Sequence, residues 1–148
     1  MPEQFDTVAR IAAELAIRNL LARIAQSADV GTPEEYLALF TDDAVWEMPA
    51  NPALGLDASA RRGVGEIGAG VAERRAAGIQ GPGSHTRHMV ATISVEVTSP
   101  DTAVAHSYWT YWGDTTTAPV VTSLGAYRDE LRRTPDGWKL ARRTVEMG

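Results

Sequence analysis

The sequence predicts an α+β fold in which helices cover one face of a curved, mainly antiparallel sheet. Hydrophobic residues recur at helical spacings early in the chain, and from residue 88 onward they alternate with polar residues as in strands. Tight turns separate these later strands, so neighbouring strands are expected to pair antiparallel. Helices segregated from such a sheet pack against one of its faces. No repeat or domain boundary is visible, so residues 1–148 are expected to form one domain.

A first long helix is expected to begin at Asp6 or Thr7, either of which can cap it, and to end at Gly31. Its second half carries a hydrophobic stripe at helical spacing. The stripe consists of Ile17, Leu20, Leu21, Ile24 and Ala28. Asp29 lies on the flank of this stripe, where its carboxylate can point sideways into a cavity beneath the helix.

A second helix is expected after Thr32, which can cap it while Pro33 takes the first helical position. Glu35 can complete a capping box with Thr32. We expect this helix to include Phe40 and to end at the polar residues that follow it.

A first strand is then expected over Ala44–Met48, with Trp46 on the same face as Met48. A loop rich in proline, asparagine and glycine follows over Pro49–Ala60. Beyond it, the spacing of hydrophobic residues predicts a weaker helix over Gly63–Ala77.

Four longer strands are expected in the rest of the chain. They span His88–Val97, Ala103–Trp112, Val120–Arg133 and Trp138–Val145. On the first of them, strict alternation places one continuous hydrophobic face over Met89, Ala91, Ile93, Val95 and Val97, with His88 on the opposite, mixed face. Either this mixed face lines the cavity or a bulge near the start of the strand turns His88 inward, and we favour the first. On the next strand, His106, Tyr108 and Trp112 are expected to face the cavity.

Composition and charge exclude several classes of function. The net charge of −5 provides no positive footprint for nucleic acid or an anionic membrane. The absence of cysteine excludes disulfides and thiolate metal sites and suits the reducing cytoplasm. The first residues lack the features of a signal peptide, and no hydrophobic run approaches the ~20 residues of a membrane span. We therefore expect a cytoplasmic protein with no nucleic-acid or membrane partner.

Several segments together resemble a known superfamily. They are the long helix with Asp29, Leu39–Trp46, Gly63 with Glu66–Ile67, His88, Tyr127–Glu130, Asp136–Leu140 and Arg142–Arg143. This pattern, which covers nearly the whole chain, resembles the SnoaL-like branch of the nuclear transport factor two-like superfamily. The resemblance implies a cone-shaped α+β barrel. Its members include polyketide cyclases, scytalone dehydratase, ketosteroid isomerase, a hexachlorocyclohexane dehydrochlorinase, bile-acid dehydratases and non-catalytic subunits.

The resemblance also implies candidate catalytic residues. In the dehydrochlorinase and in scytalone dehydratase, an aspartate at the end of the first helix pairs with a histidine that opens a strand, and Asp29 and His88 occupy these positions. His106 resembles a second histidine of scytalone dehydratase. A catalytic tyrosine of that enzyme is replaced by Ala28, and a lysine of the dehydrochlorinase by Ile24.

The match to ketosteroid isomerase fails at its catalytic residues. The isomerase's tyrosine would fall at Ile24, and its base, an acid before a proline on the first strand, falls at Met48. Steroid isomerisation by that mechanism is therefore not expected.

An aspartate–histidine pair is suited to moving a proton to and from carbon. The carboxylate fixes the tautomer of the imidazole and stabilises the imidazolium that forms when the ring accepts a proton. Because an imidazole titrates near neutral pH, it can accept a C–H proton and return it to a departing hydroxide. The structural alternative is that Asp29 caps the end of its helix and that His88 is a half-exposed strand residue.

The remaining predicted site residues would form the walls of the cavity. Those proposed to contact substrate are Trp46, Met48, His106, Tyr108, Trp112 and Arg133. Arg133, Arg142 and Arg143 lie on the last two strands, and one of them could hold an anionic group of the substrate or leaving group. The alternative is that these residues serve only the structure: Trp46 as a core aromatic, His106 as a sheet histidine, and the arginines as solvated residues at the sheet edge.

Two further patterns are rejected. His85, His88 and His106 are potential metal ligands, but the first two straddle the start of a strand instead of sharing a helix face. Gly63–Gly68 matches the letters of a dinucleotide fingerprint, yet it follows a polar loop instead of a hydrophobic strand. We therefore expect no metal and no cofactor.

These observations predict a cofactor-free lyase, a dehydratase or a related elimination or isomerisation catalyst, for a small apolar or polyketide-like molecule. The alternatives are a polyketide cyclase that uses Asp29 as its acid–base group and a non-catalytic binding domain like the small subunits of ring-hydroxylating oxygenases. The lyase requires an open cavity of ~300 Å³ or more. The binding domain predicts a cavity filled by its own side chains. Val121 and Leu124 on the outer sheet face predict self-association, and the resemblance implies a homodimer or homotrimer.

Overall fold

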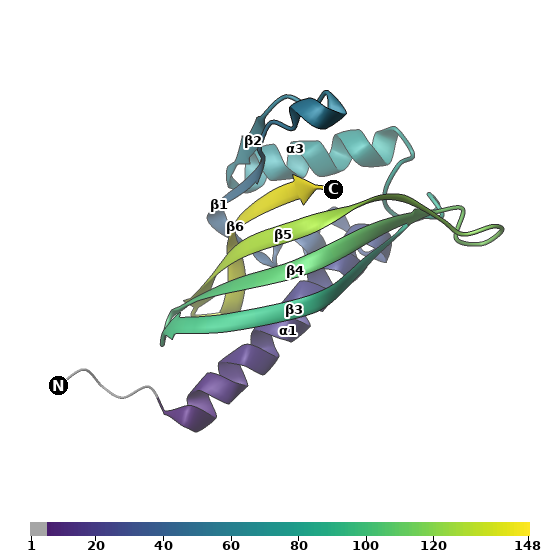
Figure 1. Cartoon of the computed structure of the whole chain (residues 1–148). Helices are drawn as coiled ribbons and strands as arrows, with labels where there is room; N and C mark the ends of the chain where they lie inside the picture. Colours follow the sequence, from purple (N-terminus) through teal and green to yellow (C-terminus); the bar gives the residue numbers. More distant parts are fainter. Residues whose placement is uncertain (1–5) are drawn as a thin grey trace.

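A computed structural model describes residues 6–148 as a six-stranded sheet with helices packed against it (Figure 1). The helices are α1 (Thr7–Val30), α2 (Pro33–Leu37) and α3 (Gly63–Ala76), with one 3-10 turn, η1 (Pro52–Leu54). The strands are β1 (Phe40–Met48), β2 (Ser59–Arg62), β3 (Arg87–Ser99), β4 (Thr102–Gly113), β5 (Val120–Thr134) and β6 (Gly137–Met147). This segregation of helices and strands confirms the predicted α+β class.

The sheet is mixed, with the strand order β2–β1–β6–β5–β4–β3. Strands β3 to β6 follow one another as an antiparallel meander, as predicted. Strand β1 pairs parallel with β6 and antiparallel with β2. Helix α1 packs mainly on β3 and α3 mainly on β1, so the two helices lie over different parts of the sheet (Figure 1). The arrangement is that of an α+β cone.

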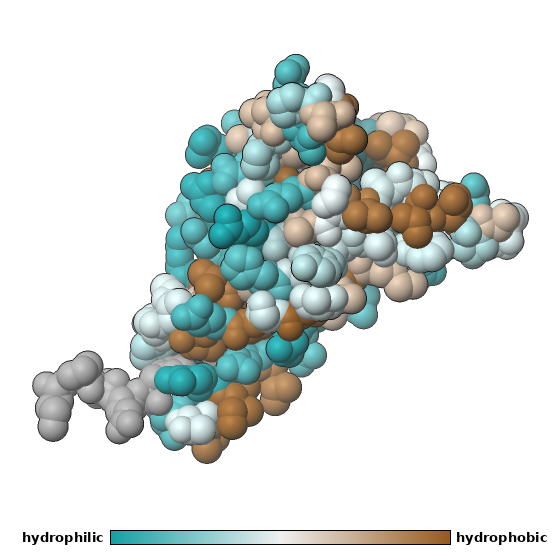
Figure 2. Space-filling model, in the orientation of Figure 1, coloured by the Kyte–Doolittle hydropathy of each residue, from teal (hydrophilic) through white to brown (hydrophobic). Residues whose placement is uncertain are grey.

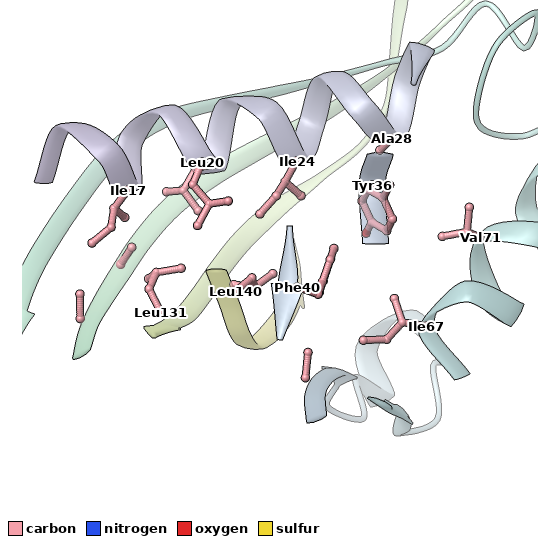
Figure 3. Packing of buried hydrophobic residues seen from close by; sticks show 14 residues of the cluster. Ile17, Leu20, Ile24, Ala28, Tyr36, Phe40, Ile67, Val71, Leu131 and Leu140 are labelled. Carbon is pink, nitrogen blue, oxygen red and sulfur yellow. The ribbon is translucent and has the colours of Figure 1, made fainter. Parts of the chain in front are cut away.

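Helix α1 supplies the centre of the hydrophobic core. Asp6 caps the helix by accepting a hydrogen bond from the amide of Val8 at 3.3 Å. The predicted stripe is buried, and its side chains point from the helix toward Leu131 and Leu140 of the sheet (Figure 3). Burying each such leucine or isoleucine contributes ~1.5–3 kcal/mol. This packing fixes the last turn of α1, and with it Asp29, against the sheet.

The predicted capping box of α2 is present. The hydroxyl of Thr32 accepts a hydrogen bond from the amide of Glu35 at 3.1 Å, and the Glu35 carboxylate accepts one from the amide of Thr32 at 3.0 Å. The helix is shorter than predicted, however, and β1 begins at Phe40 instead of Ala44. Phe40 leaves the helix because its backbone pairs with Leu140 on β6.

Two segments around α3 also differ from the prediction. Ser59–Arg62 form the short strand β2 because their backbone pairs with β1, although no hydrophobic alternation marks them as a strand. Helix α3 starts directly after β2 and ends at Ala76, close to the predicted Ala77. The glycines of Gly63–Gly68 therefore lie inside a helix that is not preceded by a buried strand.

A β-bulge in β3 changes which residues face the interior. The register with β4 shifts between Ala91 and Ser94, where Thr92 has a φ of 53°. Before the bulge, His88 and Val90 face inward. After it, the residues packed against the core are Ile93, Val95 and Val97. The predicted continuous hydrophobic face from residue 89 to residue 97 is wrong because an inserted residue interrupts the alternation.

The surface carries two groups of exposed hydrophobic side chains. Val120, Val121 and Leu124 lie at the start of β5, and Figure 2 shows hydrophobic residues gathered there. Ile11 and Leu15 are exposed on the first turns of α1. Within residues 6–148, no helix combines the length and the hydropathy that crossing a membrane requires. Self-association through the sheet stays a prediction.

Candidate active site

A cavity of about 220 Å³ opens among α1, α3 and the inner face of the sheet. Its walls include Ile24 and Ala28 of α1, Trp46 and Met48 of β1, and Trp109 of β4. The volume is below the ~300 Å³ expected for an enzyme pocket, so only a small ligand fits. The cavity is not filled by the protein's own side chains, in contrast to the expectation for the non-catalytic domain.

Asp29 and His88 meet at this cavity. Asp29 is 4% exposed, and its Oδ1 lies 2.7 Å from His88 Nδ1. Its other oxygen, Oδ2, accepts a hydrogen bond from the backbone N–H of His88 at 3.0 Å. One carboxylate therefore fixes both the backbone and the ring of His88. The second ring nitrogen, Nε2, forms no hydrogen bond to any residue between 6 and 148, and His88 lines the cavity.

Arg75 holds the end of α1 that carries Asp29. From α3, its Nη2 donates to the carbonyl oxygen of Gly31 at 2.9 Å and reaches those of Ser27 and Ala28 at 3.3 and 3.5 Å. The last carbonyl groups of a helix have no partners within the helix, and a cation is favourable at this end. Arg75 thus joins α3 to α1 beside the candidate catalytic carboxylate.

Tyr111 packs against the His88 ring, with the ring centroids 4.5 Å apart. It pairs with His88 across the β3–β4 ladder, and its hydroxyl donates a hydrogen bond to the carbonyl oxygen of Ile79. Burial raises the pKa of the Tyr111 phenol. Tyr111 is therefore a neutral wall of the cavity that limits the orientations of the imidazole.

A buried ion pair with Asp129 holds Arg143, which lines the cavity. Arg143 donates to Asp129 from Nε at 2.8 Å and from Nη2 at 2.9 Å, and the two residues face each other on β6 and β5. Burial lowers the pKa of Arg143, but the adjacent Asp129 carboxylate outweighs this and raises it above its ordinary value. The guanidinium also lies 3.8 Å from the ring centroid of Tyr127, a phenol whose pKa burial raises to about 12.

The guanidinium of Arg143 keeps one nitrogen available. Its Nη1 forms no hydrogen bond to a residue in the described part of the chain, and Arg143 lines the cavity. The indole Nε1 of Trp109, also a lining residue, is buried and has no partner there either. Buried donors without partners are costly. Nη1 of Arg143 can donate to an oxygen atom of a bound molecule, whereas Nε1 of Trp109 is enclosed by the protein.

Only some of the residues predicted to contact substrate lie at the cavity. Trp46 and Met48 line it, whereas His106, Tyr108, Trp112 and Arg133 do not. His106 and Tyr108 are exposed on the outer face of the sheet, and Arg133 is exposed near the β5–β6 turn. The Trp112 indole donates to the Thr110 hydroxyl at 2.9 Å.

The wrong face of β4 was predicted because its inward residues are small where α1 packs. Ala103 and Ala105 belong to the core, followed on the same face by Ser107 and Trp109. A sequence pattern of small residues on one side and large polar ones on the other does not reveal which side is covered by a helix. Tyr111 and Trp109 were missed for this reason.

From the sequence, Arg143 was predicted only as one of three arginines that could hold an anionic group of the substrate. A signal for it exists in the sequence, since Tyr127, Asp129 and Leu131 alternate on one strand while Arg143 and Val145 alternate on the next. Opposite charges in two such hydrophobic alternations indicate a buried cross-strand pair. Within residues 6–148, no three histidine, aspartate or glutamate side chains gather closely enough to hold a metal ion.

Gly125 leaves space for the indole of Trp109 in the cavity wall. A Cβ atom at this position of β5 would collide with the carbonyl oxygen of Glu146 and lie 2.8 Å from Cζ2 of Trp109. We expect Gly125→Ala to lower the free energy of unfolding by ~1–3 kcal/mol, because the backbone or the indole must move. Urea unfolding measures this. Gly65→Ala is the matched control, since nothing lies within 4 Å of its added Cβ. Equal stability of both variants would contradict the close approach.

Comparisons with known proteins agree with this architecture. The profile of the SnoaL-like domain matches residues 9–144. No protein of curated function matches the chain significantly. Among solved structures, an NTF2-like protein with a cystatin-like fold from Novosphingobium aromaticivorans is 24% identical, with a TM-score of 0.77 over 99% of this chain and 91% of that one.

Two further structures from Novosphingobium aromaticivorans carry functional assignments. A protein assigned as an aromatic ring hydroxylase is 29% identical, with a TM-score of 0.73 over 93% of this chain and 90% of that one. A protein assigned as a scytalone dehydratase is 19% identical, with a TM-score of 0.71 over 97% and 89%. With nearly its whole length matched by the family profile, the chain belongs to the SnoaL-like domain family.

Proposed function

We propose that the protein is a cofactor-free lyase that removes water from a small molecule, or carries out a related elimination or isomerisation, with Asp29 and His88 as its acid–base pair. The observation that supports this best is the 2.7 Å contact between Asp29 Oδ1 and His88 Nδ1 at the wall of an open cavity. The carboxylate holds the proton on Nδ1, so the lone pair of Nε2 is available as a base.

In the proposed reaction, Nε2 of His88 takes a proton from a substrate carbon. The electrons of that C–H bond form a carbon–carbon double bond as the neighbouring C–O bond breaks. The departing hydroxide accepts the proton from the imidazolium and leaves as water. Asp29 stabilises the imidazolium in between, and a base of this kind contributes ~10²–10⁴ to the rate.

Negative charge that develops on a substrate oxygen requires donors. Nη1 of Arg143 has no partner within residues 6–148, and Arg143 lines the cavity. Donors oriented in advance toward a developing charge stabilise the transition state more than water does, because they need no reorganisation. The ion pair with Asp129 keeps Arg143 in place for this role.

The similarity to a protein assigned as a scytalone dehydratase supports dehydration as the first reaction to test. A cyclase that uses Asp29 alone as acid and base is the near alternative. A second alternative is a non-catalytic domain like the small subunits of oxygenases. It is supported by the exposed hydrophobic residues at the start of β5. The contact between Asp29 and His88 and a cavity that the protein's own side chains leave unfilled favour the lyase over that domain, although the volume of about 220 Å³ is below the ~300 Å³ expected of the lyase.

The test is a screen of small polyketide and terpenoid alcohols for loss of one water, followed by mass spectrometry. We expect at least one alcohol to be dehydrated by the natural chain and not by His88→Ala. Circular dichroism and thermal unfolding establish that the variant is folded. Dehydration that continues at full rate in the folded variant would exclude His88 as the base, and the cyclase mechanism would then be tested with Asp29→Asn.

A further inference from the structure

Arg74 is a second cation in the cavity wall, separate from the dyad and from the Arg143 pair. It lies in the last turn of α3, is partly buried, and lines the cavity. In the part of the chain between residues 6 and 148, it forms no ion pair with any carboxylate. A partly buried guanidinium without a carboxylate partner is unfavourable unless another group compensates its charge.

The orientation of Arg74 is nevertheless fixed. Its Nε donates to Oε1 of Gln80 at 2.5 Å, and Gln80 is only 7% exposed. Its Cζ lies 5.8 Å from the ring centroid of Trp46 on β1. Both terminal nitrogens, Nη1 and Nη2, form no hydrogen bond to any described residue. The guanidinium is therefore held by the hydrogen bond of its Nε to Gln80 and by its contact with the Trp46 ring. Its two terminal nitrogens have no partner among the described residues.

The charges near Arg74 do not neutralise it. Burial is the main influence on the pKa of Arg74 and lowers it, followed by the neutral phenol of Tyr36, the Arg61 cation and the neutral phenol of Tyr111. The nearby carboxylate of Glu73 lies 2.7 Å from Nη2 of Arg61 and is paired with it.

The two buried acids behind the cavity wall each pair with a lining residue other than Arg74. Asp29 is bonded to His88, and Asp129 to Arg143. Arg74 thus contributes an uncompensated positive charge to a largely hydrophobic cavity.

We propose that Arg74 binds a carboxylate group of the substrate, and that the substrate is a small, hydrophobic carboxylic acid. A carboxylate matches the two terminal N–H groups of a guanidinium in a planar, bidentate contact. One uncompensated cation suits a single negative charge better than a doubly charged phosphate. This inference rests on the proposed function only in placing the acid in the same cavity as His88.

The positions of Arg74, Tyr111 and His88 indicate how such a molecule would be oriented in the cavity. Tyr111 packs on His88, and both residues line the cavity together with Arg74. An acid held by Arg74 would extend its hydrophobic part along Tyr111 toward the imidazole, and a cavity of about 220 Å³ limits that part to one or two rings.

The test compares carboxylates with uncharged molecules of the same shape. Benzoate, trans-cinnamate and 2-naphthoate are each titrated into the protein by calorimetry, next to the corresponding primary alcohol. We expect the natural chain to prefer at least one carboxylate to its alcohol, and Arg74→Gln to lose that preference by ~10- to 100-fold, as for hydrogen bonds to charged groups. Arg74→Lys should restore part of it.

Arg62→Gln is the matched control, because Arg62 is exposed beside α3 and changes the net charge equally. It should leave the preference unchanged. The proposal is overturned if no carboxylate of the series binds, if no carboxylate is preferred, or if the preference survives in folded Arg74→Gln, which would point to Arg143. Because the probes do not react, this result is independent of whether the lyase activity is found.

Discussion

Asp29→Asn is expected to lower turnover by ~10²–10⁴-fold while the domain remains folded. The substitution keeps the shape of the side chain but replaces one acceptor oxygen by an NH₂ donor. In the natural chain, Asp29 accepts two hydrogen bonds from His88, one from its backbone N–H at 3.0 Å and one from Nδ1 at 2.7 Å. An asparagine can accept only one of them with its single oxygen.

The backbone N–H of His88 can act only as a donor, so it is expected to take the asparagine oxygen. The NH₂ group then faces Nδ1, which must become the acceptor and give its proton to Nε2. His88 thereby changes tautomer and no longer presents a lone pair to the cavity. The fold keeps both contacts between α1 and β3, but the base is lost.

This tautomer change can be measured without a substrate. Two-bond ¹H–¹⁵N correlation spectra are expected to show a protonated Nδ1 for neutral His88 in the natural chain and a protonated Nε2 in Asp29→Asn. Asp42→Asn is the matched control, since Asp42 is exposed and the loss of charge is the same. An unchanged tautomer in Asp29→Asn, or full activity in that variant, would refute the assigned role of the carboxylate.

Local rules predict where Asp29 and His88 stand in the chain, whereas their pairing was predicted from the resemblance to the dehydrochlorinase and to scytalone dehydratase. Asp29 ends a helix whose hydrophobic stripe orients it, and His88 opens a strand. The capping box at Thr32 and the α1 boundaries were predicted on the same local grounds. Helix caps and periodicities involve neighbours in sequence, so they can be recognised without knowledge of the fold.

The remaining walls of the cavity depend on contacts between distant segments. The bulge at Thr92 lies where the pairing of β3 with β4 shifts register, and Ala103 and Ala105 are buried in the same cluster as the stripe of α1. Strict alternation offers two equivalent faces, and only tertiary packing decides between them. His106 and Tyr108 were therefore placed on the inside when the structure has them outside. The strand β2 was missed for a similar reason, because only its pairing with β1 makes it a strand.

The second large effect is expected from Asp129→Leu. The side chain of Asp129 is fully buried and that of Arg143 is 5% exposed, so the substitution leaves a buried guanidinium without its counter-charge. We expect the free energy of unfolding to fall by ~3–5 kcal/mol, measured by urea unfolding. Asp43→Ala is the control, because it removes a carboxylate from an exposed pair with Arg132 and should have a much smaller effect. Similar losses in the two variants would contradict the importance of burial.

The double variant Asp129→Leu with Arg143→Met separates stability from chemistry. Replacing both members of a buried pair by hydrophobic residues removes the unpaired charge, so most of the stability lost in Asp129→Leu should return. The cavity would nevertheless lose Nη1 of Arg143, the donor that the proposed reaction uses for substrate oxygen. A stable double variant is therefore expected to have an intact Asp29–His88 contact and the natural tautomer, but turnover reduced by ~10²–10³-fold, as for the loss of one such donor. If the double variant is stable and fully active, the buried pair serves only the fold. If it is stable and impaired, the ion pair is retained because it holds a donor at the cavity, at a position where two hydrophobic side chains would serve stability equally well.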